Sequence, residues 1–191
     1  MRVLVACEFS AIVRDAFRAR GHDSWSCDLL PCEGDPQWHI QGDALEAIKQ
    51  GWDLMIAHPP CTDLAVSGAA WFKRKGLPRI QAAVDFFNAL LWAPINRICL
   101  ENPVSLASRF IRPPDQIVHP WQFGHMEQKA TCLWLVGLPC LMETDNVREA
   151  MLKLPKADRE RLHYLPPSKD RAKLRSQTFP GIAAAMADQW G

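Results

Sequence analysis

A thiol and a carboxylic acid follow two short apolar runs in this sequence. Cys61 comes after two prolines that end the run 54–57, and Glu101 ends the run 98–101. A thiolate can add to an electron-poor carbon, and a nearby acid can protonate or hydrogen-bond the ring nitrogen that collects the electrons. Placed on adjacent strand ends, Cys61 and Glu101 could together carry out addition to an electron-poor ring.

The two prolines before Cys61 indicate that the thiol is held in one place. Pro59 and Pro60 each hold φ at about −65° and lack an N–H donor, so the loop can keep Cys61 in a single pose. A lone cysteine after such a pair is more often a packed thiol, but the second motif, 101–103, favours the chemical interpretation. On a cytosine ring, Cys61 would add at C6 and Glu101 would hold N3. The C5 carbon would then become nucleophilic enough to take a methyl group from a sulfonium donor.

Short apolar runs alternate with helical patterns along the chain, which is typical of an α/β fold with a mostly parallel sheet and helices on both faces. The predicted strands are residues 3–7, 23–27, 54–57, 98–101 and 131–136. The predicted helices are residues 12–20, 44–50, 80–91 and 181–190. In open α/β sheets, ligands bind beyond the carboxyl ends of the strands. The ends of the four clearest strands and the loops after them carry Glu8, Asp28, Cys61 and Glu101, so we expect these side chains to meet at one edge.

Length and composition predict a single domain over residues 1–191. The chain is 48% hydrophobic and 23% charged, which fits one compact α/β domain. Residues 138–175 are rich in proline and charge, and we interpret them as a small insertion or lid. No run approaches about 18 uninterrupted apolar residues and no signal-peptide layout is present, so a cytoplasmic protein without a membrane partner is expected.

The cysteines and the charges exclude few classes of function. Seven cysteines without a Cys-x-x-Cys pair predict reduced thiols and no metal site. The net charge of +1 identifies no partner. Basic residues cluster at 73–79 and at 159–175, and both solvated surfaces and phosphate contacts fit these clusters.

Several motifs resemble those of cytosine-C5 DNA methyltransferases, and the chain looks most like the short members encoded by bacteriophages. The resemblance rests on Pro60-Cys61, on Ser67-Gly68 and on Glu101-Asn102. It covers most of residues 1–137 and again 175–191. It implies a Rossmann-like, S-adenosylmethionine-dependent methyltransferase fold, DNA as the partner, and a target cytosine flipped out of the duplex in a bacterial or phage-infected cell.

The resemblance also assigns roles to residues. The catalytic residues that it implies are Cys61, Glu101, Lys129 and Thr131, of which the last two stand in the family's basic motif beside the target base. The cofactor-binding residues that it implies are Cys7, Glu8, Phe9, Ser10, Asp28, Asp43 and Pro59. The residues that it implies for the target nucleotide are Pro60, Ser67, Asn102, Arg74 and Arg175. Segment 176–181 would return to close the cofactor pocket.

Three motifs depart from the family pattern. Ser10-Ala11 replace glycines of the first loop, which let the backbone approach the cofactor closely. Thr62 replaces the glutamine that usually follows the cysteine. Lys129 and Thr131 replace two arginines, so a guanidinium near the base would have to come from elsewhere, and Arg74 and Arg175 are the candidates.

The largest departure is in residues 138–175, which stand where the family has a much larger target-recognition domain. Sequence-specific readout needs side chains that reach into a groove as well as phosphate contacts. A segment this short predicts a very short DNA site, or help from a second copy of the chain in a homo-oligomer.

Three other functions stay open. Amino-methyltransferases acting on adenine or cytosine also end this strand in a Pro-Pro motif, but His58 replaces the usual acceptor and Cys61 the usual aromatic. The chemistry of Cys61 and Glu101 would equally serve a free cytosine nucleotide, which would explain the missing recognition domain. A protein that keeps the cofactor fold without efficient catalysis would bind its ligands and modify nothing.

Overall fold

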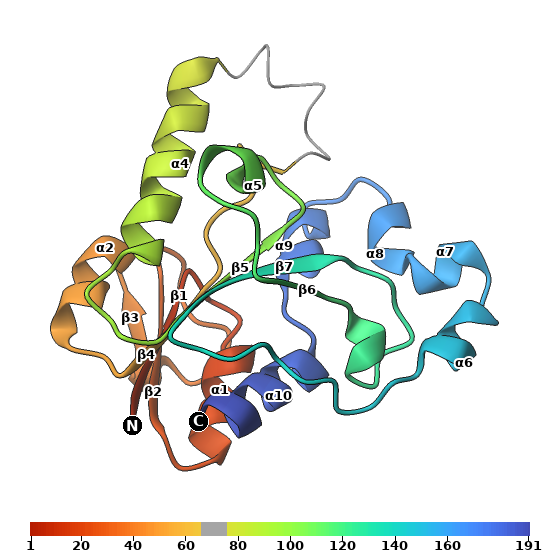
Figure 1. The fold of residues 1–191 in the computed structure, drawn as a ribbon, viewed down its shortest axis with the longest axis horizontal. Coiled ribbons are helices and arrows are strands. Elements are labelled where there is room, and N and C mark those ends of the chain that lie inside the picture. Colours follow the sequence, from red (N-terminus) through yellow and green to blue (C-terminus); the bar gives the residue numbers. More distant parts are fainter. Residues whose placement is uncertain (66–75) are drawn as a thin grey trace.

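A mostly parallel sheet forms the centre of the computed structural model, which describes residues 1–65 and 76–191 (Figure 1). Within these residues the sheet has seven strands in the order β3-β2-β1-β4-β5-β7-β6. The strands β1 to β5 are mutually parallel, whereas β7 runs antiparallel to both β5 and β6. The predicted fold class is confirmed at the level of architecture: the chain has a Rossmann-like α/β fold with a mostly parallel sheet. The strands are β1 (Arg2–Ala6), β2 (Asp23–Asp28), β3 (His39–Gln41), β4 (Leu54–Ala57), β5 (Ile98–Pro103), β6 (Gln116–Val118) and β7 (Thr131–Val136).

Helices cover both faces of the sheet (Figure 1). Side chains alternate along each buried strand, so Val3 of β1 packs toward one layer of helices and Leu4 toward the other. The helices of the first layer are α1 (Ile12–Ala19) and α10 (Pro180–Trp190), and the main helices of the second are α2 (Ala44–Ala47) and α4 (Leu77–Leu91). The shorter α5 (Ala107–Phe110) follows β5, and 3-10 turns occupy η1 (Pro36–Trp38), η2 (Ile48–Gln50) and η4 (Pro120–Gln122).

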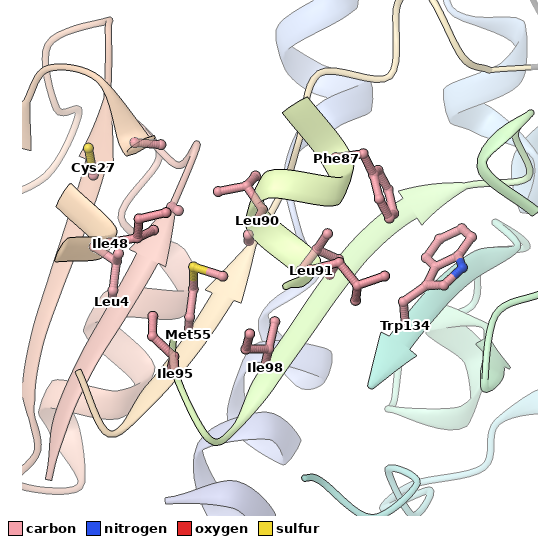
Figure 2. Packing of buried hydrophobic residues seen from close by; sticks show 14 of the residues in the cluster. Leu4, Cys27, Ile48, Met55, Phe87, Leu90, Leu91, Ile95, Ile98 and Trp134 are labelled. Atoms are coloured by element: carbon pink, nitrogen blue, oxygen red, sulfur yellow. The ribbon is translucent and has the colours of Figure 1, made fainter. Parts of the chain in front are cut away.

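Apolar side chains of α4 hold the middle strands together (Figure 2). Phe87 and Leu91 of α4 belong to the same buried cluster as Met55 of β4 and Trp134 of β7. The rings of Phe87 and Trp134 meet edge to face, with centroids 5.1 Å apart and an interplanar angle of 81°. This packing keeps β4 and β5 in one rigid layer, and their carboxyl ends carry the candidate reactive residues.

Two predicted elements are longer than expected by two or more residues. The strand predicted over 98–101 continues to Pro103 as β5, because its pairing with β7 extends to Pro103 opposite Thr131. The helix predicted over 80–91 begins at Leu77, since Pro78 fits into the first turn of a helix, where no N–H partner is lost. Among the described residues, no helix is both long enough and apolar enough to cross a membrane.

Short helices separated by loops make up residues 138–175. Figure 1 shows α6, α7 and α8 grouped beyond β6, on the side of the sheet opposite β3. The buried carboxylate of Glu127 fastens this segment, because it accepts hydrogen bonds from the Arg161 guanidinium at 3.0 Å and from the Leu162 N–H at 3.1 Å. A single domain with an inserted lid stays a prediction. The helices are α6 (Arg148–Leu152), α7 (Lys156–Arg159), α8 (Arg161–Tyr164) and α9 (Arg171–Ser176).

The turn after β7 needs a glycine at position 137. Gly137 has φ +62°, and a Cβ there would lie 2.2 Å from the backbone oxygen of Asn96. We therefore expect Gly137→Ala to lower the free energy of unfolding by about 3 kcal/mol, as measured by urea denaturation. Gly42→Ala is the matched control, because a Cβ at Gly42 has no heavy atom within 4 Å. Equal unfolding midpoints for the two variants would contradict this prediction.

Candidate active site

A cleft lies at the edge of the sheet where β1, β2 and β4 end. Its walls are residues 7–10 after β1, Asp28 at the end of β2, and His58 and Pro60 after β4, together with residues 176–178 before α10. Five of the residues that we expected to bind a cofactor thus line one cleft. The returning segment 176–178 lies against it, where the sequence pattern had suggested a closing segment.

The loop that carries Cys61 is braced by the end of β5. The Asn102 side-chain amide donates a hydrogen bond to the Pro59 carbonyl at 2.8 Å. The Cys61 carbonyl accepts the N–H groups of Leu64 at 3.0 Å and Ala65 at 2.8 Å, which turns the chain away from the sheet. Asn102, expected at the target nucleotide, is only 1% exposed. Asn102 therefore supports the Cys61 loop from inside the protein and is not on a surface that a substrate reaches. Pro59 is also buried.

Charged groups around Cys61 determine its ionisation. Burial raises the pKa of the half-buried Cys61 thiol, and the negative charge of Glu101 raises it further. The positive charges of Lys129 and Arg175 act in the opposite direction without reversing the shift. Cys61 is therefore mostly a thiol at neutral pH, and a role as nucleophile would require the loss of its proton. These interactions also place Glu101, Lys129 and Arg175 within electrostatic reach of the sulfur.

Glu101 and His58 form a buried pair on adjacent strand ends. In the parallel register of β4 and β5, Ala57 lies opposite Leu100, so the next residues, His58 and Glu101, are also neighbours. His58 Nδ1 lies 3.0 Å from Glu101 Oε2, and each side chain is 11% exposed. Burial opposes both charges, but the hydrogen bond and the mutual attraction outweigh it. The pKa of Glu101 is lowered and the pKa of His58 is raised, so both shifts favour the charged forms, an imidazolium beside a carboxylate.

Lys129 connects the reactive groups to the segment before α10. Its Nζ donates to the Arg175 carbonyl at 2.9 Å and lies 3.5 Å from the Gln177 carbonyl, while its charge helps to lower the pKa of Glu101. Thr131, expected beside Lys129 in a catalytic role, is 4% exposed at the start of β7. Its hydroxyl donates to the Lys129 carbonyl at 3.5 Å. Thr131 therefore supports Lys129 from within the sheet and does not join the reactive groups.

The first loop uses Glu8 to cap helix α1. The buried carboxylate of Glu8 accepts the N–H groups of Val13 at 2.7 Å and Arg14 at 3.2 Å. Ala11, just before the helix, has φ +65° and offers no capping side chain. Alanine thus adopts, at a cost of about 1 kcal/mol, the left-handed conformation that glycine adopts freely. Glu8 lines the cleft as expected, but its oxygens are already engaged with the helix.

The cleft beside β1 and β2 carries the negative charge of Asp28. The pKa of the Cys7 thiol is raised to about 12. Burial is the largest cause, and the negative charge of Asp28 is the next. Asp28 Oδ1 accepts the Leu30 N–H at 2.9 Å, which holds this carboxylate at the cleft. Asp43 does not line the cleft and instead caps α2 by accepting the Leu45 N–H at 2.8 Å. A positively charged small molecule would be favoured in these surroundings.

Two of the expected substrate-binding residues, Ser67 and Arg74, lie outside the described residues. Of the others, Pro60 is exposed at the cleft and Arg175 acts on Cys61 through its charge. Within residues 1–65 and 76–191, no group of His, Cys, Asp and Glu side chains is arranged to hold a metal ion.

His58 is the site residue to which the sequence pattern gives no definite role. Its type and its place before two prolines fit a loop-orienting residue and a packed histidine equally well. Its contact with Glu101 follows from the register of β4 and β5, in which each residue is one position beyond the last paired residues. The contact of His58 with Glu101 could have been predicted by assuming that the runs 54–57 and 98–101 pair in parallel with their carboxyl ends aligned.

Comparisons with known proteins include a structural likeness. No protein-family model and no curated protein matches this chain. A solved structure that resembles it is a prophage-encoded E. coli protein provisionally named a DNA modification methyltransferase. The two chains are 17% identical with a TM-score of 0.45, and the match covers 82% of this chain and 56% of the other. The chain therefore spans little more than half the length of that protein.

Proposed function

We propose that the protein is a DNA methyltransferase that transfers a methyl group from S-adenosylmethionine to C5 of cytosine. The observation that carries the proposal is that Cys61, which follows β4, and Glu101 of the neighbouring strand β5 lie within electrostatic range of each other and of Lys129, beside a separate cleft. A nucleophile, an acid and a cation are what addition to a pyrimidine ring requires. Cytosine and DNA are implied by the motifs in which Cys61 and Glu101 stand.

The cleft of residues 7–10, Asp28 and 176–178 would bind the methyl donor. The negative charge of Asp28 fits the positive charge of a sulfonium, and the same carboxylate offers an acceptor for hydroxyl groups. Bound there, S-adenosylmethionine supplies an electrophilic methyl group. Glu8 would contribute indirectly, since it holds α1 in place behind the cleft.

Cys61 would act as the nucleophile on a cytosine flipped out of the duplex. Its thiolate forms a bond to C6 while the electrons of the C5=C6 bond move toward N3, where a proton arrives from Glu101. C5 then takes the methyl group. Loss of the C5 proton to a base allows the C6–S bond to break, which returns its electron pair to sulfur and restores the ring. The charge of Lys129 favours the thiolate of Cys61 and so eases the first step.

The same chemistry on a free cytosine nucleotide is the second candidate. The observation that favours it is the small size of residues 138–175, whose longest complete helix, α6, has five residues. Such a segment offers little surface for reading a DNA groove. An amino-methyltransferase is less well supported, because His58, at the first position of the Pro-Pro motif, is bonded to Glu101.

Transfer of a labelled methyl group from S-adenosylmethionine distinguishes these functions. The acceptors are duplex DNA, single-stranded DNA and free cytosine nucleotides, with the product nucleosides identified by mass spectrometry. We expect 5-methylcytosine in duplex DNA. Label on free nucleotides alone would assign the second candidate, whereas N4-methylcytosine or N6-methyladenine would assign an amino-methyltransferase. No transfer to any acceptor, with cofactor binding intact, would contradict an enzymatic function.

A further inference from the structure

The buried pair of His58 and Glu101 holds one proton between two side chains, and the resting position of that proton matters for the reaction. We propose that His58 is a positioning residue that stores the proton which Glu101 delivers to the ring nitrogen of the substrate, and that it takes the proton back at the end of each cycle. This inference rests on the proposed function of the site.

The geometry of His58 leaves Glu101 as its hydrogen-bond partner. Nδ1 lies 3.0 Å from Glu101 Oε2, which is hydrogen-bond distance for a nitrogen donor and a carboxylate acceptor. The other ring nitrogen, Nε2, is buried and has no partner within the described part of the chain. The orientation of the ring is therefore set by Glu101, and no second carboxylate competes by hydrogen bond for the proton on Nδ1.

The charges around His58 favour the proton on the imidazole. Three groups face it from different elements: Glu101 on β5, Glu8 in the loop after β1, and Lys129 just before β7. Burial and Lys129 disfavour the imidazolium, but the Glu101 hydrogen bond, the Glu101 charge and the Glu8 charge together favour it more strongly. Glu101 is correspondingly ionised. An ionised carboxylate accepts hydrogen bonds and donates none, so Glu101 by itself has no proton for N3.

The proton then follows the electrons of the ring. When the Cys61 thiolate bonds to C6, negative charge collects at N3 and makes it more basic than the carboxylate. The Nδ1 proton of His58 moves to Glu101, Glu101 gives a proton to N3, and His58 becomes neutral. When the C5 proton leaves to a separate base and the C6–S bond breaks, the N3 proton returns through Glu101 to His58. Each cycle restores the imidazolium, so the pair consumes no proton.

Two substitutions at His58 separate proton storage from hydrogen bonding. In His58→Asn the side-chain amide nitrogen takes the place of Nδ1, so the hydrogen bond to Glu101 is kept while the transferable proton is lost. In His58→Gln the amide takes the place of Nε2, and the hydrogen bond is lost as well. We expect both variants to lose about 100-fold or more in kcat with KM unchanged. His22→Asn, at the amino end of β2, is the control and should match the wild type.

Activity of His58→Asn at the wild-type level would overturn the inference, because a purely structural hydrogen bond would survive in that variant. The pH profile of kcat provides a readout that a structural role would not move. In the wild type the rate should stop rising with pH at the titration midpoint of His58, and in His58→Asn this bend should be absent.

Nitrogen-15 NMR of the free protein measures that midpoint without any methyl transfer. We expect His58 to titrate above its ordinary pKa of 6.5 in the wild type and at lower pH in Glu101→Gln. A His58 midpoint at or below 6.5 that Glu101→Gln does not change would overturn proton storage, whichever acceptor is methylated. Failure of the proposed function is distinguishable, because it would appear as inactivity of the wild type itself.

Discussion

Cys61→Ser should reduce methyl transfer by at least about 10,000-fold while leaving cofactor binding unchanged. A serine hydroxyl is scarcely ionised at neutral pH and is a poor nucleophile toward C6, whereas even a thiol of raised pKa yields a small thiolate fraction. The measurement is single-turnover transfer of labelled methyl groups, with cofactor affinity followed by calorimetry. Cys140→Ser is the matched control, because Cys140 is an exposed thiol outside the cleft and should retain full activity.

The covalent intermediate offers a direct test of the same residue. A DNA substrate with fluorine at C5 of the target cytosine can accept the thiolate and the methyl group, but no base can remove fluorine as a cation. The adduct should therefore accumulate and appear by mass spectrometry as protein linked to oligonucleotide. Cys61→Ser should give no adduct, and an adduct in that variant would exclude Cys61 as the nucleophile.

Glu101→Gln should lower kcat by about 100-fold to 10,000-fold, because glutamine cannot pass a proton to N3. It should also weaken the fold, since it removes the charge that faces the buried imidazolium of His58. We expect a loss of about 2 kcal/mol in the free energy of unfolding near pH 5.5. Glu46→Gln is the matched control, because the Glu46 carboxylate is exposed in its ion pair with Lys49 and should have little effect.

The pH dependence of this loss follows from the two pKa shifts. The lowered pKa of Glu101 stabilises the folded protein above 4.5, and this contribution disappears as the pH falls through the folded value. The raised pKa of His58 stabilises it below 6.5, and this contribution disappears as the pH rises through the folded value. The difference in stability between Glu101→Gln and the wild type should therefore be largest between 4.5 and 6.5. A difference that grows above this range would contradict the ion pair.

The sequence pattern predicts the central strands because these buried strands consist of consecutive apolar residues. Runs 54–57 and 131–136 have the same bounds as β4 and β7, whose residues are largely buried. The short strands β3 and β6 were not predicted, since each has three residues of mixed polarity. Their pairing with β2 and β7 supplies the order that the local sequence lacks.

The candidate site was predictable as a set of strand ends but not as a set of contacts. Cys61 and Glu101 could be assigned to one edge because parallel strands end together. The hydrogen bond of His58 to Glu101 depends on strand register, which no local pattern encodes. The engagement of Glu8 with α1 depends on the left-handed backbone of Ala11, and alanine gives no sign of that conformation in a sequence.

The anchoring of residues 138–175 has a consequence for how such a protein diversifies. Leu138, at the start of this segment, and Phe179, just beyond its end, both pack against the core cluster beneath α1 and α10. Doubling the length of a chain segment between fixed ends costs only about 0.6 kcal/mol. Evolution could therefore exchange or enlarge this segment while Cys61, the pair of His58 and Glu101, and the neighbouring cleft are kept unchanged.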